Sequence, residues 1–165
     1  KYRLIDEYLR FYFHYIYPNL KLISDGKISN IFANKVRPKW SSWLGIAFEN
    51  FCFKNIQLIC QTLRIEKTLV DFFPLIQTTL KGGLQIDLVL KTSDKSLFIC
   101  ECKYHEVAIG LSVIAELENK LKFFKIPRGF SIKKVLIAPR GITKDLEKTN
   151  YFDSILKIED LFYKH

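Results

Sequence analysis

The chain has 165 residues, enough for one domain with its own core, and carries a formal net charge of +9. This basic excess favours polyanionic partners such as nucleic acids, although it does not identify them. No apolar run is long enough to cross a bilayer, so we expect no membrane partner.

The first residues predict an aromatic helix. Residues 5–17 have helical periodicity, with Asp6 as a plausible cap and Pro18 as the expected end. The aromatic stripe has two interpretations, stacking on bases or packing against the domain or an upstream segment, and packing is favoured. It consists of Tyr8, Phe11, Tyr12 and Tyr15. Because the sequence opens on Lys1 inside this pattern, we expect it to be part of a longer protein.

A connecting segment and a long buried helix follow. Residues 19–38 hold one short helical stretch, 28–34, and Pro38 closes the segment. Residues 40–63 predict the longest helix, capped by Ser41 or Ser42 and apolar on all sides. Glu49 lies inside it among small and apolar neighbours. From the residues alone it is either a functional ligand or a salt-bridged core residue.

The centre of the chain predicts strands. Residues 66–81 hold a first strand, around 70–73 or 75–80, and Pro74 favours an edge position or a break. Residues 83–90 and 97–103 then form a hairpin whose loop, 92–96, places Lys91 opposite Leu97 and Asp87 opposite Glu101. Lys103 shares the face of Glu101. Opposed like charges destabilise a sheet, whereas two converging carboxylates are suited to Mg²⁺.

The last third predicts a helix over 106–124, a strand over 134–139, a short helix capped by Thr143, a strand over 155–158 and a terminal helical turn. The order of helix, three strands, helix and strand predicts an α/β fold with a mixed central sheet flanked by helices. Several lysines are candidates for contacts with nucleic-acid phosphates, the alternative being an ordinary solvated face. They are Lys120, Lys122, Lys125, Lys133 and Lys134.

The chain contains four cysteines without the paired spacing of a zinc site, namely Cys52, Cys60, Cys100 and Cys102. On their strand, Cys100 and Cys102 alternate with Glu101 and Lys103, so their thiols point to the opposite face. We expect them to be buried, reduced and uninvolved in metal binding, which favours a cytoplasmic protein.

Asp87 followed by Cys100-Glu101-Cys102-Lys103 resembles the signature of the PD-(D/E)XK nuclease superfamily, with Ile86 in place of the proline. Together with Gly83 and Gln85, the hairpin is similar to the nuclease-like C-terminal domain of prokaryotic AAA-type ATPases. The resemblance implies a restriction-endonuclease-like core at 40–165, behind a helical extension at 1–39 from an upstream ATPase or winged-helix region of the same chain.

The resemblance also implies a site. Asp87 and Glu101 would hold Mg²⁺, or Mn²⁺ in its place, and Lys103 would act in catalysis. The setting Gly45-Ile46-Ala47-Phe48-Glu49 is similar to the family's helix that supplies a glutamate to the metal. Leu117 and Lys120 match a Leu-x-x-Lys pattern, which makes Lys120 a candidate for substrate contact.

The function so implied is metal-dependent hydrolysis of phosphodiester bonds, with DNA as the expected substrate. The alternative is a catalytically silent module of the same fold that binds nucleic acid or regulates an ATPase. A plain protein-interaction domain is a third interpretation, based on the aromatic first helix. The sequence has no Gly-x-x-x-x-Gly-Lys-Ser/Thr phosphate loop, so ATP hydrolysis does not belong to this segment. It leaves oligomerisation open.

Overall fold

The computed structural model describes residues 4, 6–26, 30–79 and 82–162. Its contacts divide the chain into a helical unit, Lys1–Asn50, and a sheet unit, Phe51–His165. The predicted domains meet instead at residues 39 and 40, and that assignment stays a prediction. The starts of the two predicted helices at residues 5 and 28 lie outside the described residues.

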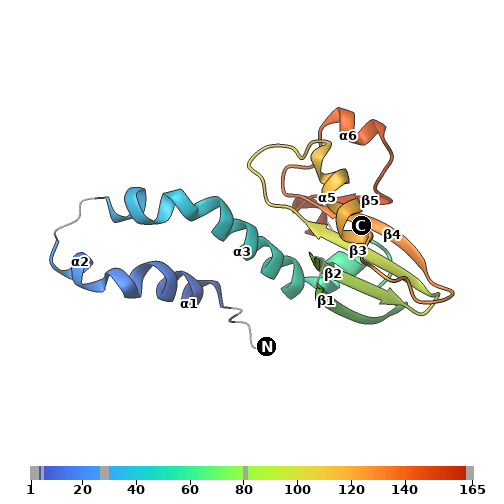
Figure 1. The fold of residues 1–165 in the computed structure, drawn as a ribbon, viewed down its shortest axis with the longest axis horizontal. Helices are drawn as coiled ribbons and strands as arrows, with labels where there is room; N and C mark the ends of the chain where they lie inside the picture. The colour runs from blue at the N-terminus through green and yellow to red at the C-terminus, as the bar shows by residue number, and fades with distance from the viewer. Residues whose placement is uncertain (1–3, 5, 27–29, 80–81, 163–165) are drawn as a thin grey trace. The chain divides into compact units, whose positions relative to one another are not determined.

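The helical unit consists of two arms (Figure 1). The first contains α1 (Glu7–Phe11), η1 (Tyr12–Ile16), η2 (Tyr17–Asn19) and α2 (Leu20–Ser24). The second contains η3 (Phe32–Val36), η4 (Arg37–Lys39) and the start of α3 (Trp40–Lys54). Asp6 caps α1 as predicted, because its Oδ1 accepts a hydrogen bond from the Leu9 amide at 2.8 Å.

Pro18 does not end the first helix, and Pro38 does not close the connecting segment, so both expectations were wrong. In each arm a π-helical turn precedes the proline, which then stands at the start of a 3₁₀ turn. Proline lacks an amide hydrogen and its ring clashes with the carbonyl four residues earlier in a regular α-helix. A wider π turn next to a 3₁₀ turn changes that spacing, so helical structure continues past both prolines.

The aromatic stripe contributes to packing within the helical unit. The Phe11 ring contacts Trp40 and Trp43 of the second arm, with centroids 6.2 and 5.8 Å apart. Tyr15 is buried and lies beside Phe11. The favoured packing interpretation is therefore confirmed for Phe11 and Tyr15, whereas Tyr8 is exposed.

The predicted helix over 40–63 is in fact two helices, α3 and α4 (Ile56–Thr62), separated at Asn55. Ser41 and Ser42 do not cap it. They lie inside α3, because helical structure runs directly from η4 into Trp40. The predicted caps assumed that a helix begins just after Pro38. Helical structure instead continues through the 3₁₀ turn that contains Pro38, so no helix N-terminus forms at Ser41 or Ser42.

The sheet unit has five strands in the order β1-β2-β3-β4-β5 (Figure 1). They are β1 (Leu69–Thr79), β2 (Gly82–Thr92), β3 (Ser96–Cys102), β4 (Ser131–Ile137) and β5 (Ser154–Leu156). The first three pair antiparallel, and β3-β4 and β4-β5 pair parallel. The predicted mixed sheet flanked by helices is confirmed, and β1 is an edge strand, as Pro74 indicated.

Helical segments connect the parallel strands. They are α5 (Ser112–Leu121) before β4 and α6 (Lys144–Lys148) before β5, and η5 (Glu159–Leu161) follows the last strand. The helix predicted over 106–124 is shorter than expected, because residues 103–111 are largely irregular. Thr143 caps α6 as predicted, accepting from the Leu146 amide at 3.4 Å.

The two faces of the sheet are buried by different helices. Leu97 and Ile99 of β3 share a core cluster with Val113 and Leu117 of α5. Full burial of such a side chain stabilises the fold by about 1.5–3 kcal/mol.

No helix in the described ranges is long and apolar enough to cross a membrane.

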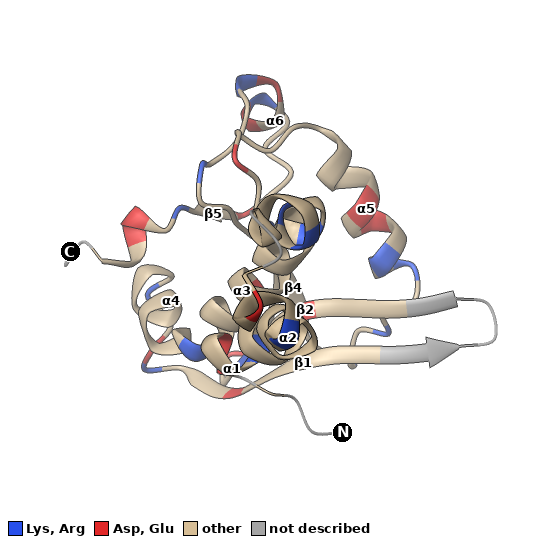
Figure 2. Ribbon diagram, turned by 90° about the vertical axis from the view of Figure 1, so that its left-hand side faces the viewer, with Lys and Arg blue, Asp and Glu red and all other residues tan. Residues whose placement is uncertain are grey.

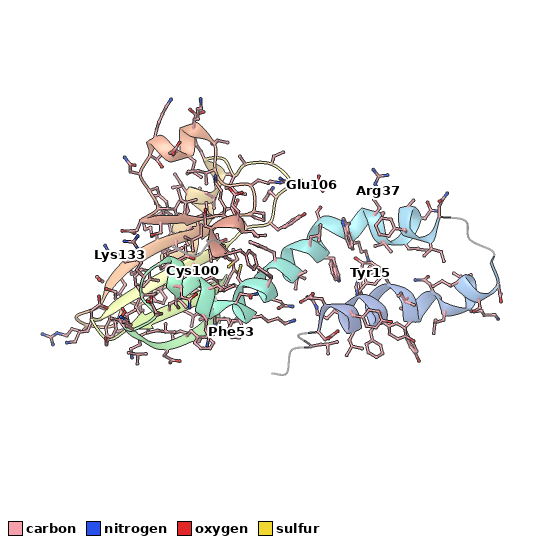
Figure 3. The ribbon with its side chains drawn as sticks, turned by 180° about the vertical axis from the view of Figure 1, so that it is seen from behind. Tyr15, Arg37, Phe53, Cys100, Glu106 and Lys133 are labelled. Carbon is pink, nitrogen blue, oxygen red and sulfur yellow. The ribbon has the colours of Figure 1, made fainter. Side chains whose placement is uncertain are left out.

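The opposite face of β3 packs its cysteines against the helices before the sheet. Cys102 and Cys100 lie near Cys52 of α3, and Cys100 also lies near Cys60 of α4. All four thiols are buried, as predicted for Cys100 and Cys102, and Figure 3 shows Cys100 inside the sheet unit. Burial raises the pKa of Cys100, which keeps the thiol protonated and unreactive.

Candidate active site

The site begins with a β-bulge in β2. Phe73 pairs with Val89 and Leu75 pairs with Ile86, so Asp87 and Leu88 together stand opposite the single residue Pro74. Proline offers no amide hydrogen for the ladder, which explains why the irregularity falls there. A bulge reverses the alternation of side chains and re-aims its neighbours, and it places Asp87 at the point where the strand changes face.

The bulge brings the Asp87 side chain to β3. The pairs Lys91–Leu97 and Leu88–Cys100 confirm the predicted hairpin register, and the ladder ends just before Asp87. There the Asp87 Oδ2 atom accepts a hydrogen bond from the Cys102 amide at 2.9 Å. The half-buried Asp87 carboxylate thus accepts the bond that a backbone carbonyl would accept in a regular ladder. This bond holds it beside Glu101.

Glu101 projects from β3 toward α5 and is only 1% exposed. Its two carboxylate oxygens each accept a hydrogen bond from the Lys120 Nζ atom at 2.7 Å. The Lys103 Nζ atom lies 3.4 Å from Glu101 Oε1 and 2.6 Å from Glu116 Oε2. Two lysines therefore share this buried carboxylate, and Lys120 is the nearer one.

The electrostatics of the site reflect crowding of like charges. Burial raises the pKa of Glu101, and the charge of Asp87 raises it further, while Lys120 and Lys103 act in the opposite direction. Desolvation lowers the pKa of Lys103, but its bonds and charge interactions with Glu116 and Glu101 outweigh this and raise the pKa overall. Asp87, Glu101 and Lys103 thus lie in one electrostatic cluster.

Sequence reasoning did not single out Glu116, nor did it place Lys120 against Glu101. Glu116 and Lys120 are four apart on α5, a spacing that puts them on the same helical face. Figure 2 shows acidic and basic segments on this helix. The i,i+4 spacing was a usable signal that α5 presents an acid and a base together, although it did not reveal Glu101 as their partner.

The other predicted lysines have separate surroundings. Lys122 donates to the Asn119 side chain at 2.7 Å, and Lys125 lines a small cavity beside Phe124 and Phe130. On β4, Lys133 lies 3.5 Å from Asp153 and Lys134 lies 3.0 Å from Glu118. Figure 3 labels Lys133 on this strand. Glu49 belongs to the helical unit, so the structure does not describe its position relative to Asp87 and Glu101.

Comparison with protein families assigns the chain to one of them. A family model matches residues 12–118, well over half of the sequence; it is DUF234, described as Archaea bacterial proteins of unknown function. The chain belongs to the DUF234 family. The DUF234 match includes Glu49, Asp87, Glu101, Lys103 and Glu116 and ends just before Lys120. No curated protein matches the chain.

Solved structures with similarity to this DUF234 chain include three proteins. A protein of unknown function has a TM-score of 0.48 and 16% identity over 66% of this chain. A repair endonuclease from Pyrococcus abyssi has a TM-score of 0.42 and 18% identity over 66%. EndoMS in complex with double-stranded DNA has a TM-score of 0.40 and 17% identity over 70%. The chain spans 63%, 44% and 43% of these proteins, respectively.

The cluster of Asp87, Glu101 and Lys103 offers some of the oxygen ligands that a hard divalent cation needs. Asp87 and Glu101 offer carboxylate oxygens, the ligands that Mg²⁺ prefers, and Mg²⁺ commonly takes only one or two carboxylates besides water. Among the described residues, no three His, Cys, Asp or Glu side chains gather as a metal site. Both Glu101 oxygens accept from Lys120, so a bound ion would share this carboxylate with an ammonium group 2.7 Å away.

Proposed function

We propose that residues 40–165 form a metal-dependent nuclease domain that hydrolyses phosphodiester bonds of nucleic acid, with DNA as the first substrate to test. The observation that carries this proposal is the convergence of two carboxylates and a lysine at the bulge of the hairpin. The charge of Asp87 acts directly on Glu101, and Lys103 lies 3.4 Å from the same carboxylate. Burying two carboxylates close together lowers the stability of the fold, so folding by itself does not account for this arrangement.

In this proposal, Asp87 and Glu101 hold Mg²⁺ or Mn²⁺, with a backbone carbonyl of Ile99 or Cys102 as a further ligand. The ion, when bound, lowers the pKa of a water molecule and neutralises charge on the phosphate. Lys103 orients that water and stabilises negative charge that develops on the phosphate. The family resemblance adds Glu49, which would complete the outer or inner shell of the ion.

Lys120 gains a role from its position. It balances the charge of Glu101 at 2.7 Å, and its side chain is partly exposed. Once it releases Glu101, its ammonium group is available to a phosphate oxygen at the same site. Lys122, Lys125, Lys133 and Lys134 extend the proposed contact with nucleic acid.

A second candidate function is a catalytically silent module of the same fold. One observation favours it, because two lysines already balance the charge of Glu101. The module would then bind nucleic acid or regulate an ATPase in the same chain. That upstream ATPase and a cytoplasmic location are part of both proposals, and oligomerisation stays open.

The decisive experiment is a cleavage assay of the purified chain on plasmid and single-stranded DNA. We expect cleavage with Mg²⁺ or Mn²⁺, none with EDTA, and a loss of at least about 100-fold in Asp87→Asn. Asp71→Asn is the matched control, since Asp71 is an exposed strand acid that lines a different cavity. Metal-independent cleavage, or full activity in Asp87→Asn, would contradict the nuclease proposal.

A further inference from the structure

The helical unit contains a cavity that the proposed nuclease function does not use. Its volume is about 670 Å³, and its walls come from both helical arms, from α1 and η1 on one side and from η4 and α3 on the other. This volume falls within the usual range of small-molecule sites, about 300–1,000 Å³. All lining residues belong to Lys1–Asn50, so the cavity lies within one unit.

The polar groups around the cavity are suited to an anion. Arg10, His14, Lys39 and the Ser42 hydroxyl line it, and no carboxylate occurs among the lining residues of the described chain. Glu7 accepts a hydrogen bond from Arg10 Nη1 at 2.8 Å, which fixes the guanidinium group on α1. The remaining donors of Arg10 and the Lys39 ammonium are suited to phosphate oxygens.

The apolar walls are largely aromatic. Tyr15, Phe13 and Trp43 line the cavity, and Trp43 stacks on Trp40 with ring centroids 5.0 Å apart and an interplanar angle of 4°. Figure 3 labels Tyr15 on the first arm of the unit. Aromatic faces beside cations are the combination that proteins use to stack a base while contacting its phosphate.

One donor at this cavity lacks a partner. The Trp43 Nε1 atom is buried and has no hydrogen-bond partner in the described part of the chain. A buried donor without a partner costs about 1–3 kcal/mol, so such groups usually have a function or an unseen partner. An acceptor on a bound ligand would satisfy this indole N–H once the Trp43 ring turns to present it to the cavity.

We propose that this cavity binds a nucleotide, with the base against the Trp43 and Tyr15 rings and the phosphate against Arg10 and Lys39. The shared chemistry is a nucleoside phosphate, whether free or as one unit of a nucleic-acid strand. The cavity includes neither Asp87 nor Glu101 among its lining residues, and the proposed binding needs no metal ion. The proposal therefore stands whether or not the chain is a nuclease.

The chain itself provides the readout. Its only two tryptophans are Trp40 and Trp43, so intrinsic tryptophan fluorescence reports on this cavity alone. The experiment titrates the full chain with ADP, with a deoxythymidine oligonucleotide and with inorganic phosphate, all in EDTA. We expect saturable quenching by at least one of the two nucleotide probes and none by phosphate. ADP alone would identify a free nucleotide, and the oligonucleotide alone a strand.

Variants test which groups bind. Lys39→Gln is expected to weaken the binding at least about tenfold, the effect of losing one charge-assisted contact. Lys21→Gln, on the exposed face of α2, is the matched control and should bind like the wild type. Trp43→Phe keeps an aromatic wall but loses the indole donor, and isothermal titration should show weaker binding. Absence of quenching by both probes, or unchanged affinity in Lys39→Gln and Trp43→Phe, would overturn the proposal.

Discussion

At the scale of single residues, the site depends on how two lysines divide one buried carboxylate. Lys120 reaches both oxygens of Glu101, whereas Lys103 lies farther from Glu101 and closer to Glu116. One lysine can therefore neutralise Glu101 while the other acts on a substrate. Alanine substitutions of Lys103 and Lys120 are expected to differ in their effect on stability.

Lys103→Ala is expected to abolish cleavage while changing the free energy of unfolding by less than about 1 kcal/mol, as for a partly exposed ion pair. Lys120→Ala is expected to cost more, about 1.5–3 kcal/mol, because it removes charged hydrogen bonds to a buried acceptor. Thermal melts and plasmid cleavage on both variants make the comparison. Lys148→Ala is the control, because Lys148 is an exposed lysine of α6 whose partner is Asp145 at 3.8 Å.

If Lys103→Ala instead melts early, with or without Mg²⁺, and the wild type cleaves nothing, the silent module becomes the better description. Mg²⁺ binding should survive in Lys103→Ala. It should strengthen in Lys120→Ala, because a positive charge 2.7 Å from the Glu101 carboxylate is then removed.

The pH dependence follows from Glu101. Because its pKa is raised in the folded state, folded protein keeps this proton to higher pH than the unfolded chain does. The stability from this group is thus full below the unfolded pKa and decreases as pH rises through the folded pKa. Asp87→Asn removes a charge that raises the pKa of Glu101. In this variant we therefore expect a lower Glu101 pKa and a smaller loss of stability as pH rises.

The measurement is the carboxyl carbon chemical shift of Glu101 across about pH 4 to 8, beside urea unfolding at the same values. Asp71→Asn should leave the Glu101 titration unchanged. An unchanged Glu101 pKa in Asp87→Asn would contradict the coupling between the two carboxylates.

At the scale of elements, α5 must be held on the sheet for Lys120 to reach Glu101. Beyond its apolar face, α5 is fixed by Glu118, whose carboxylate accepts from the Tyr151 hydroxyl and from Lys134 Nζ. The Lys134 ammonium also lies 3.9 Å from the centre of the Tyr151 ring. These contacts connect α5, β4 and the segment before β5.

Tyr151→Phe tests this connection. We expect a loss of about 0.5–1.5 kcal/mol in the free energy of unfolding, the usual net value of one hydrogen bond. The Tyr151 and Lys134 bonds lower the pKa of Glu118, so the variant should raise that pKa toward its ordinary value. Chemical denaturation and carboxyl chemical shifts check both effects.

The control is Ile137→Val, at a buried residue of β4 that takes no part in the described hydrogen bonds of Glu118 and Tyr151; it should lower stability but leave the Glu118 pKa unchanged. A Tyr151→Phe variant with the stability and the Glu118 pKa of the wild type would show that α5 is held by its apolar face alone.

At the scale of the whole molecule, the lysines that contribute to the net charge of +9 are not equally available. Lys133 and Lys134 already contact Asp153 and Glu118. Lys122 and Lys125 are exposed, and the nearest bond of Lys122 is to the neutral Asn119 side chain. A lysine with an acidic partner contributes less free energy to phosphate binding, because it must first break its contact with the carboxylate.

We expect affinity for nucleic acid to fall steeply as salt rises. The double variant Lys122→Ala/Lys125→Ala should reduce the slope of log affinity against log salt by about 0.9 for each phosphate that is no longer neutralised. Lys133→Ala/Lys134→Ala is the charge-matched control, with a smaller effect expected. Fluorescence anisotropy of a labelled duplex in EDTA measures both. An affinity that does not change with salt would remove nucleic acid as a partner.

The local sequence was sufficient for several parts of this fold. The hairpin register from Lys91 and Leu97, the edge position of the strand with Pro74 and the Thr143 cap all depend on residues close together in the chain. Alternation, a missing amide hydrogen and a side-chain cap act over a few residues, so their effects can be predicted without knowing the rest of the molecule.

Other features were decided only by the tertiary structure. The bulge at Asp87 depends on Pro74 of the neighbouring strand, and Lys120 meets Glu101 only because α5 packs over β3. Helical structure past Pro18 also escaped local rules, since a π turn absorbs the proline. The sequence by itself determined which residues carry charge and how the strands alternate. Which cation meets which carboxylate depends on packing between segments far apart in the chain, because a charge interaction forms only where folding brings the two groups within a few ångströms.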